Sequence, residues 1–264
     1  MLGLGVGFYK LAGNEYVSGE LPNKAAFYFG GSHYYHSNYT GIVDNYGIYN
    51  FGANPNATGY GFSFWMRPDD GRPASNQVVM DYTVNASNNF QLVLQTDGKL
   101  AIDTYANGSK GSVASVSAVF TNGAQNWKHI VITAASESEE ENIAFGLRVD
   151  NSNVGFGESA LSSSNAINFS TTGTNQYFGA TSAGGSGYTG YLDEIAFYNT
   201  AVGLDHISNL YNSGNGANPT TLSPAPVLCW RGEENFVDSA NGQGPGTNSG
   251  VTFETDPDEL KTLV

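Results

Sequence analysis

Cysteine is almost absent from the chain, since Cys229 is the only one among 264 residues. A single thiol cannot close an intrachain disulfide or supply the several thiolates of a structural zinc site. Disulfide-rich modules and zinc-stapled folds are therefore excluded. A chain of this length does not need such staples, because it buries about three quarters of the surface that its unfolded form exposes.

Basic residues are scarce as well: 10 Lys and Arg stand against 24 Asp and Glu, which gives a formal charge of −14. Nucleic acids and anionic membranes attract clusters of positive charge, so neither is an expected partner. The sequence has no run of 18 apolar residues, which argues against a transmembrane helix. Residues 1–19 lack the basic start of a signal peptide, so no secretion signal is expected.

Glycine and aromatic residues are plentiful instead, with 34 Gly, 16 Tyr and 15 Phe. From Ala25 onward, short runs of alternating apolar and polar residues are separated by clusters of Gly, Asn, Pro and Asp, a pattern typical of an all-β sandwich. One such cluster, at residues 96–98, contains Asp-Gly and predicts a hairpin turn. Residues 204–211 have helical apolar spacing, so one short surface helix is expected.

The same pass along the chain predicts its organisation. Residues 1–24 form an N-terminal arm, residues 25–256 form one sandwich domain, and residues 257–264 form a tail. Within the domain, the Gly- and Pro-rich segment 213–226 is expected to be a crossing loop. Residues 227–256 contain two strand candidates, too few for a separate domain, so they are expected to return to the main sandwich.

Four segments carry a family resemblance. They are residues 61–68 (GFSFWMRP), 126–133 (NWKHIVIT), 190–202 (GYLDEIAFYNTAV), and 229–242, which begins CWRGEE and ends DSANG. In this order they resemble the laminin-G-like branch of the concanavalin A-like lectin/glucanase superfamily. The resemblance implies an all-β, two-sheet antiparallel jelly-roll sandwich with one short surface helix. The fourth segment departs from the pattern, since many relatives carry it at the start of the domain.

Strand alternation assigns faces to these segments. In residues 61–68, Phe62 and every second residue after it face one way, while Trp65 and Arg67 face the other. In residues 190–202, the same alternation predicts that Asp193 points into the core together with Ile195. A carboxylate in such a place must be paired or hydrogen-bonded.

Catalysis is not expected. Retaining glycosidases use two carboxylates about 5 Å apart, and the resemblance implies that a glucanase would carry them on one strand in a pattern close to Glu-x-Asp-x-x-Glu. The sequence lacks that pattern. The adjacent pair Asp193 and Glu194 would point to opposite faces of a strand, as would Glu233 and Glu234.

Calcium is the one ion that the resemblance implies, because laminin-G-like relatives often bind it through Asp side chains and backbone carbonyls. No cofactor is required for folding, and the candidate calcium ligands are Asp238, Asn241 and Asp193. Two interpretations stay open. Asp238 and Asn241 either hold the ion or form an Asx-type turn, the more common use of such residues, and Asp193 either holds it or accepts hydrogen bonds from neighbouring amides.

A Tyr-rich segment supplies the candidate ligand-binding residues, which are Tyr34, Tyr35, Tyr39, Tyr46 and Tyr49. Tyrosine offers a rigid, amphipathic contact surface at low entropic cost. These side chains are expected to stack on sugar rings, to enter a protein interface, or only to cover the end of the sandwich.

The N-terminal arm has apolar residues at alternate positions, Leu2, Leu4, Val6 and Phe8, and is expected to add a strand to a neighbour or to dock on a shell. Stand-alone domains of this kind resemble structural proteins of tailed phages. The first hypothesis is therefore a non-catalytic virion protein, a capsid decoration protein or a tail or fibre appendage. It would be located in the virion, with the major capsid protein, other virion proteins and copies of itself as partners. The second hypothesis is a lectin-like module for a host glycan, and the third is a glycoside hydrolase.

Overall fold

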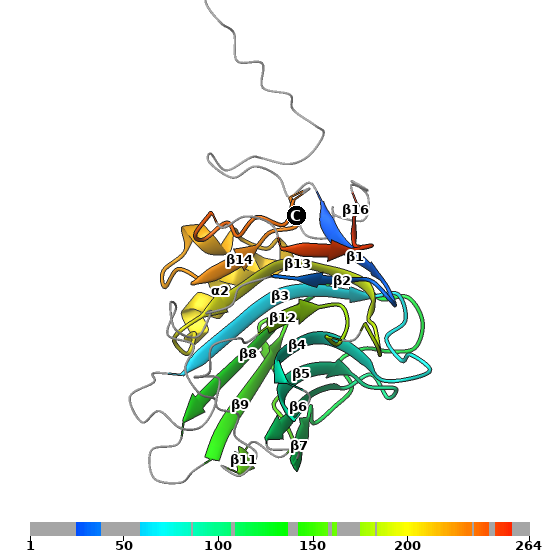
Figure 1. Ribbon diagram of the computed structural model, residues 1–264. Coiled ribbons are helices and arrows are strands. Elements are labelled where there is room, and N and C mark those ends of the chain that lie inside the picture. The colour runs from blue at the N-terminus through cyan, green and yellow to red at the C-terminus, as the bar shows by residue number, and fades with distance from the viewer. Residues whose placement is uncertain are drawn as a thin grey trace, which may run out of the picture.

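A computed structural model gives the fold as two antiparallel β-sheets packed face to face (Figure 1). The described residues are 25–37, 59–85, 87–106, 109–136, 142–157, 160–162, 175–182, 184–233, 235–242 and 246–254. The predicted arm with Leu2, Leu4, Val6 and Phe8, the predicted tail, and Tyr39, Tyr46 and Tyr49 all lie outside these residues. Within the described part of the chain, no helix is long and apolar enough to cross a membrane.

Sheet A contains nine strands in the described ranges, in the order β10-β9-β8-β3-β13-β1-β16, with β11 paired to β9 and β14 paired to β13. The central pair, β3 and β13, comes from two of the segments that carry the family resemblance. Its strands are β1 (Ala26–Gly30), β3 (Tyr60–Pro68), β8 (Lys128–Ser136), β9 (Asn142–Val149), β10 (Ser152–Asn153), β11 (Ala160–Ser162), β13 (Thr189–Tyr198), β14 (Leu228–Trp230) and β16 (Thr252–Glu254).

Sheet B contains seven strands in the described ranges, in the order β15-β2-β12-β4-β5-β6-β7. The predicted Asp-Gly turn joins β5 to β6: the Gly98 amide donates to the Gln95 carbonyl at 2.9 Å, and Gly98 has a φ of 82° that favours glycine. Its strands are β2 (Tyr34–His36), β4 (Gln77–Asn85), β5 (Asn88–Leu94), β6 (Leu100–Ala106), β7 (Ser109–Ala114), β12 (Asn175–Phe178) and β15 (Thr247–Ser249).

The C-terminal strands join both sheets. Strand β14 pairs with β13 and β16 pairs with β1 in sheet A, whereas β15 pairs with β2 in sheet B. Two residues, Gly250 and Val251, separate β15 from β16, so the chain crosses from one sheet to the other at this corner. Strands from both ends of the domain therefore lie side by side.

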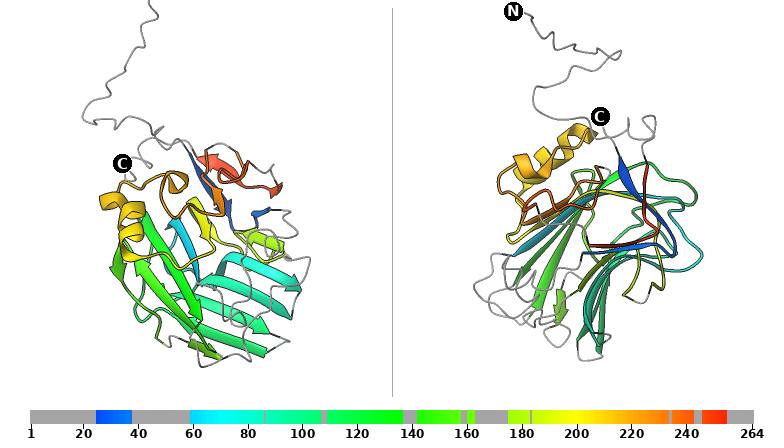
Figure 2. Two further views of the ribbon diagram at one scale, coloured as in Figure 1. Left: turned by 90° about the vertical axis from the view of Figure 1, so that its left-hand side faces the viewer. Right: turned by 45° about the horizontal axis from the view of Figure 1, so that its top comes forward.

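The main core lies between the two sheets, whose arrangement Figure 2 shows from two sides. Sheet A contributes Phe62, Phe64 and Met66, and sheet B contributes residues such as Leu92 and Ile102. Alternation along β3 confirms the predicted faces, because Trp65 belongs to a separate cluster on the outer side of sheet A.

The predicted orientation of Asp193 is wrong. A β-bulge between Asp193 and Ala196 shifts the alternation in β13, so Leu192 joins Ile195 in the main core. Asp193 is instead the register partner of Trp65, outside that core, although it is still fully buried. At the bulge, Glu194 has a φ of 46°, which is unusual for a residue with a side chain.

The α-helix that the structure describes, α2 (Leu204–Tyr211), matches the predicted range and lies on the outer side of sheet A (Figures 1 and 2). Ile207 and Leu210 pack there against Ala196 and Cys229. The helix ends at Asn212, whose left-handed φ of 47° caps it. The helix thus covers one end of the outer face of sheet A and leaves the other end to the aromatic side chains described next.

Candidate functional site

The end of sheet A that α2 does not cover carries a set of aromatic side chains around one arginine. We name it patch A; it comprises Tyr28, Arg67, Trp127, Tyr191 and Asp69. Strand register brings them together, because Tyr28 on β1 pairs with Tyr191 on β13, which pairs with Arg67 on β3. Trp127 directly precedes β8, the other neighbour of β3, and Asp69 directly follows β3. Rigid strands therefore position most of the patch.

The geometry of patch A is that of a cation held among aromatic rings. The Arg67 Cζ atom lies 4.2 Å from the centre of the Tyr191 ring and 5.8 Å from that of Trp127. The Tyr28 and Tyr191 rings lie 4.8 Å apart, tilted by 46°. The Tyr28 hydroxyl donates to Asp69 Oδ2 at 3.2 Å. Such contacts each contribute about 0.5–1.5 kcal/mol and fix the rings in place.

Patch A is partly open to solvent. Tyr28, Tyr191 and Arg67 are half-buried, Asp69 is exposed, and Trp127 is 8% exposed. Partial burial raises the pKa of Tyr28 and Tyr191 above the usual 10, so both hydroxyls stay protonated at neutral pH and can donate hydrogen bonds. The patch thus combines flat apolar surfaces, hydroxyl donors, a guanidinium and a carboxylate.

A second group lies on the outer face of sheet B. We name it patch B; it comprises Tyr34 and His36 on β2 and Asn175 and Tyr177 on β12. The His36 and Tyr177 rings are stacked, with centres 4.4 Å apart and planes 9° apart, and the Tyr34 ring meets Tyr177 edge-on at 5.9 Å. His36 Nε2 is 3.0 Å from Asn175 Oδ1. Tyr34, predicted from the sequence as a ligand-binding residue, thus lies in a half-exposed aromatic group.

A buried carboxylate adjoins patch B. Asp81 on β4 is the register partner of Tyr177 and is 2% exposed. Its Oδ2 accepts a hydrogen bond from the Ser182 amide at 3.1 Å. Burial raises the pKa of Asp81 from 3.8 to about 6, an effect that this hydrogen bond reduces. The loop after β12 thus lies over Asp81 at the border of patch B.

Tyr35 is not available to a ligand, which corrects the sequence-based prediction. It is 2% exposed and stacks on Phe236, with ring centres 4.3 Å apart. Its hydroxyl donates to the Phe236 carbonyl at 3.2 Å and accepts from the Gly246 amide at 2.9 Å. In β2, Tyr34 and Tyr35 point to opposite faces, so the first is at the surface and the second is in the core.

Asp238 and Asn241 form a turn. Asp238 Oδ1 accepts hydrogen bonds from the amides of Cys229 at 2.8 Å and Ala240 at 3.0 Å, and its Oδ2 accepts from Asn241 Nδ2 at 3.2 Å. Asn241 Nδ2 also donates to the Val227 carbonyl. Both carboxylate oxygens are thus engaged with hydrogen-bond donors. This donor set fits an Asx-type turn rather than a hard cation.

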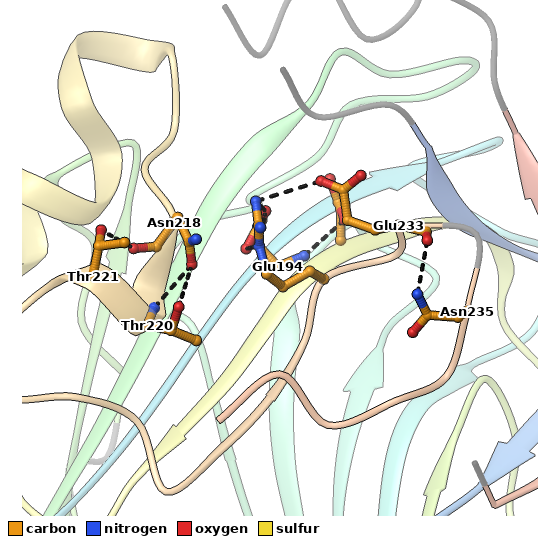
Figure 3. Close-up of polar contacts among 8 residues, drawn as sticks. Glu194, Asn218, Thr220, Thr221, Glu233 and Asn235 are labelled. Atoms are coloured by element: carbon orange, nitrogen blue, oxygen red, sulfur yellow. Dashed lines mark hydrogen bonds and ion pairs between the residues drawn. The ribbon is translucent and has the colours of Figure 1, made fainter. Parts of the chain in front are cut away.

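Asp193 and Glu194 are both buried, and their carboxylates engage different groups. Asp193 Oδ1 accepts from the Glu194 amide at 2.9 Å. The Glu194 carboxylate binds Arg231 through Nε at 3.1 Å and Nη2 at 2.9 Å, and Arg231 also lies 3.4 Å from Glu233. Figure 3 shows Glu194 and Glu233 close together and Asn235 donating to the Glu233 backbone. Among the described residues, no three His, Cys, Asp or Glu side chains gather closely enough to hold a metal ion.

Sequence reasoning missed most of patch A. Its members lie at positions 28, 67, 69, 127 and 191, so only the sheet order brings them together. One signal was present, because alternation in residues 61–68 places Trp65 and Arg67 outside the core. The register that adds the two tyrosines depends on long-range pairing, which a single sequence does not reveal.

Comparison with known proteins finds solved structures with a similar fold. Curated protein sequences give no match. Among solved structures, the heptameric SAP-like pentraxin of Limulus polyphemus matches with a TM-score of 0.55 and 12% identity over 90% of this chain and 98% of its own. A Bacteroides ovatus protein, provisionally described as carbohydrate-binding, matches with a TM-score of 0.56 and 17% identity. That match covers 89% of this chain and 60% of the Bacteroides protein.

A family model identifies the chain more directly. Residues 52–208, more than half of the sequence, match the laminin G type model described as the concanavalin A-like lectin/glucanases superfamily. This range contains three of the four segments that carry the resemblance. The two-sheet antiparallel sandwich agrees with that assignment. The chain therefore belongs to the concanavalin A-like lectin/glucanases superfamily, in its laminin G type.

Proposed function

We propose that this domain is a lectin-like carbohydrate-binding module and that patch A contacts the glycan. The observation that carries the proposal is the pair of half-exposed rings, Tyr28 and Tyr191, beside the Arg67 guanidinium on a rigid sheet. A pyranose ring presents apolar C–H groups on its faces and hydroxyls around its edge. Aromatic rings suit the faces, and Arg67 and Asp69 suit the hydroxyls.

Two comparisons support this choice over the virion role that the sequence analysis ranked first. The superfamily is described by its lectins and glucanases, and the Bacteroides ovatus relative in fold is provisionally described as carbohydrate-binding. At 17% identity, the match to the Bacteroides protein shows a similar fold and does not identify a ligand. The ligand class therefore rests on the side chains of patch A.

The test is a paired substitution in patch A. Each ring that stacks on a sugar is expected to contribute about 1 kcal/mol, so Tyr28→Ala with Tyr191→Ala should weaken glycan binding at least tenfold. Glycan arrays identify the ligand, and calorimetry measures the affinity. Tyr105→Ala is the matched control, because Tyr105 is a half-buried tyrosine on β6 in the other sheet. Unchanged glycan affinity in the double variant would show that patch A is not the glycan-binding site.

Patch A also favours a second candidate function, which is assembly with a protein. Tyr, Trp and Arg are the residues enriched at the centres of protein interfaces. A virion structural role would use such a surface together with the N-terminal arm. Light scattering distinguishes the two candidates: self-association that the double variant at Tyr28 and Tyr191 abolishes, without any glycan binding, would favour assembly.

We further propose that the domain is not an enzyme. The carboxylates of the family-like segments have structural partners: Glu194 binds Arg231, and Asp238 accepts backbone amides. Glu194 and Asp238 therefore do not supply the pair of reactive carboxylates that glycosidases use. Incubation with the bound glycan should leave its chain length unchanged, and release of reducing ends at a rate above the buffer control would contradict this proposal.

A further inference from the structure

Patches A and B lie on opposite outer faces of the sandwich. In β2, Tyr35 belongs to the main core, so its neighbours Tyr34 and His36 point away from it. In β12, Phe178 belongs to the core and Tyr177 points away. Patch A faces outward from sheet A by the same alternation, because Met66 and Leu192 are core residues next to Arg67 and Tyr191.

Patch B is an ordered aromatic surface. The His36 and Tyr177 rings are stacked nearly parallel, the Tyr34 ring meets Tyr177 edge-on, and the Asn175 amide lies within hydrogen-bonding distance of His36. Tyr34, His36 and Tyr177 are all half-buried, so their outer parts are accessible. Next to Tyr177, Asp81 is buried, and its register partner on β5 is Gln91. The surface thus shares with patch A half-buried aromatic rings beside polar groups, which here are the His36 imidazole and the Asn175 amide.

A single short glycan cannot occupy both patches. Packed sheets stand about 10 Å apart, and here a dense aromatic core fills the space between them. Any ligand at patch B is therefore separate from the ligand at patch A. Two separate sites on opposite faces of one chain join two glycan chains without oligomerisation.

From this geometry we infer that patch B is a second glycan-binding site, so that one molecule of this domain bridges two glycan chains. The inference rests on the proposed carbohydrate-binding function. It extends the proposed function from one glycan-binding site to two, on opposite faces of the sandwich. It also gives the sequence-predicted Tyr34 a role that its buried neighbour Tyr35 does not share.

The experiment counts binding sites per chain. Native gels containing yeast mannan, xylan, galactan, laminarin or alginate identify the polysaccharide that retards the protein. Calorimetry with a tetrasaccharide of that polymer then gives the stoichiometry. Wild type and the Tyr105→Ala control are expected to bind two tetrasaccharides per chain. The Tyr28→Ala/Tyr191→Ala variant and the Tyr34→Ala/Tyr177→Ala variant should each bind one.

The outcomes separate the two proposals. One site per chain in the wild type, lost in the patch A variant and unchanged in the patch B variant, would overturn the inference and leave the proposed function intact. If the wild type binds none of the five polysaccharides, both the proposed function and the inference about patch B are overturned. Thermal melting checks folding, and if the patch B double variant melts early, Tyr177→Gln alone serves in its place. Two sites remaining in that variant would likewise overturn the inference.

Discussion

At the scale of single residues, the unusual group is Asp81. It is buried in the fold with one backbone hydrogen bond from Ser182, and burial raises its pKa to about 6 from 3.8. In the unfolded chain the carboxyl ionises near its ordinary pKa, whereas the folded protein retains the proton up to about pH 6. The folded state therefore binds more protons between about pH 4 and 6, and stability contributed by Asp81 falls as pH rises through this window.

Asp81→Asn should remove this penalty. At pH 8 the variant is expected to be more stable than wild type by about 1–3 kcal/mol, from a pKa shift of about two units, and the difference should vanish near pH 3.5. Urea denaturation at both pH values measures it. Asp97→Asn, at an exposed turn, is the control for the same chemical change. An equal stability difference at pH 3.5 and pH 8 would show that Asp81 does not titrate in this way.

Cys229 should be inert in the folded protein. It is fully buried in the cluster beneath α2, and burial raises the pKa of its thiol well above the usual value. Only thiolates react rapidly with iodoacetamide. Mass spectrometry should therefore find no alkylation in native buffer and complete alkylation in urea. Rapid labelling of the native protein would mean that α2 does not cover this strand.

At the scale of elements, one largely buried ion pair lies at the bulge in β13. Glu194 has a positive φ there, and its carboxylate is held by Arg231 in the segment after β14. Removing one partner of a buried pair leaves the other charge unpaired, which costs about 3–5 kcal/mol. The pair thus ties the return of the C-terminal segment to the central strand of sheet A.

Arg231→Leu is therefore expected to destabilise the fold by about 3 kcal/mol, and Glu194→Leu combined with it should recover part of that loss, because replacing both charges removes the unpaired carboxylate. Chemical denaturation of the single and double variants measures the coupling. Lys128→Leu is the control, since the Lys128 and Asp150 side chains are 30% and 32% exposed, more than the 17% and 8% of Arg231 and Glu194, and loss of their contact should cost less than about 1 kcal/mol. Strictly additive losses would show that the pair does not act as a unit.

The elements that were predicted correctly are those whose conformation depends on residues near one another in the sequence. The range of α2 and the hairpin turn at Gly98 were predicted correctly, and so were the two faces of β3. The orientation of Asp193 was not, because a bulge adds a residue and nothing in the sequence marks it. Tyr35 was misplaced for a related reason, since a short strand among polar residues gives no clear alternation.

At the scale of the whole molecule, long-range register decides the candidate sites. Patch A takes side chains from positions up to 163 residues apart, and patch B joins β2 to β12 across most of the domain. Alternation and the spacing of turn residues therefore predict the class of fold. The sites themselves follow from sheet order, which local rules do not determine.

Removal of residues 227–264 should prevent folding. This deletion takes β14, β15 and β16 from both sheets, together with core residues Trp230, Phe236 and Val251. Loss of a buried aromatic side chain alone costs about 3–5 kcal/mol, and a typical domain has about 5–15 kcal/mol of stability. Near-UV circular dichroism should show no fixed aromatic environment. A cooperative melt of the truncated chain would mean that residues 25–226 fold independently.

The corner between β15 and β16 also bears on synthesis of the chain. Strand β1 leaves the ribosome before its partner β16, which begins at Thr252, more than 220 residues later. At about 5–20 residues per second, that partner emerges about 10–40 s after β1. Strand β13, the other neighbour of β1, begins at Thr189 and emerges earlier than β16. Until β13 emerges, the core-facing side of β1, with Phe27 and Phe29, has neither of these two neighbours. The turn between β15 and β16 thus completes the edges of both sheets, and we expect efficient folding to need protection of β1 until β13 has emerged.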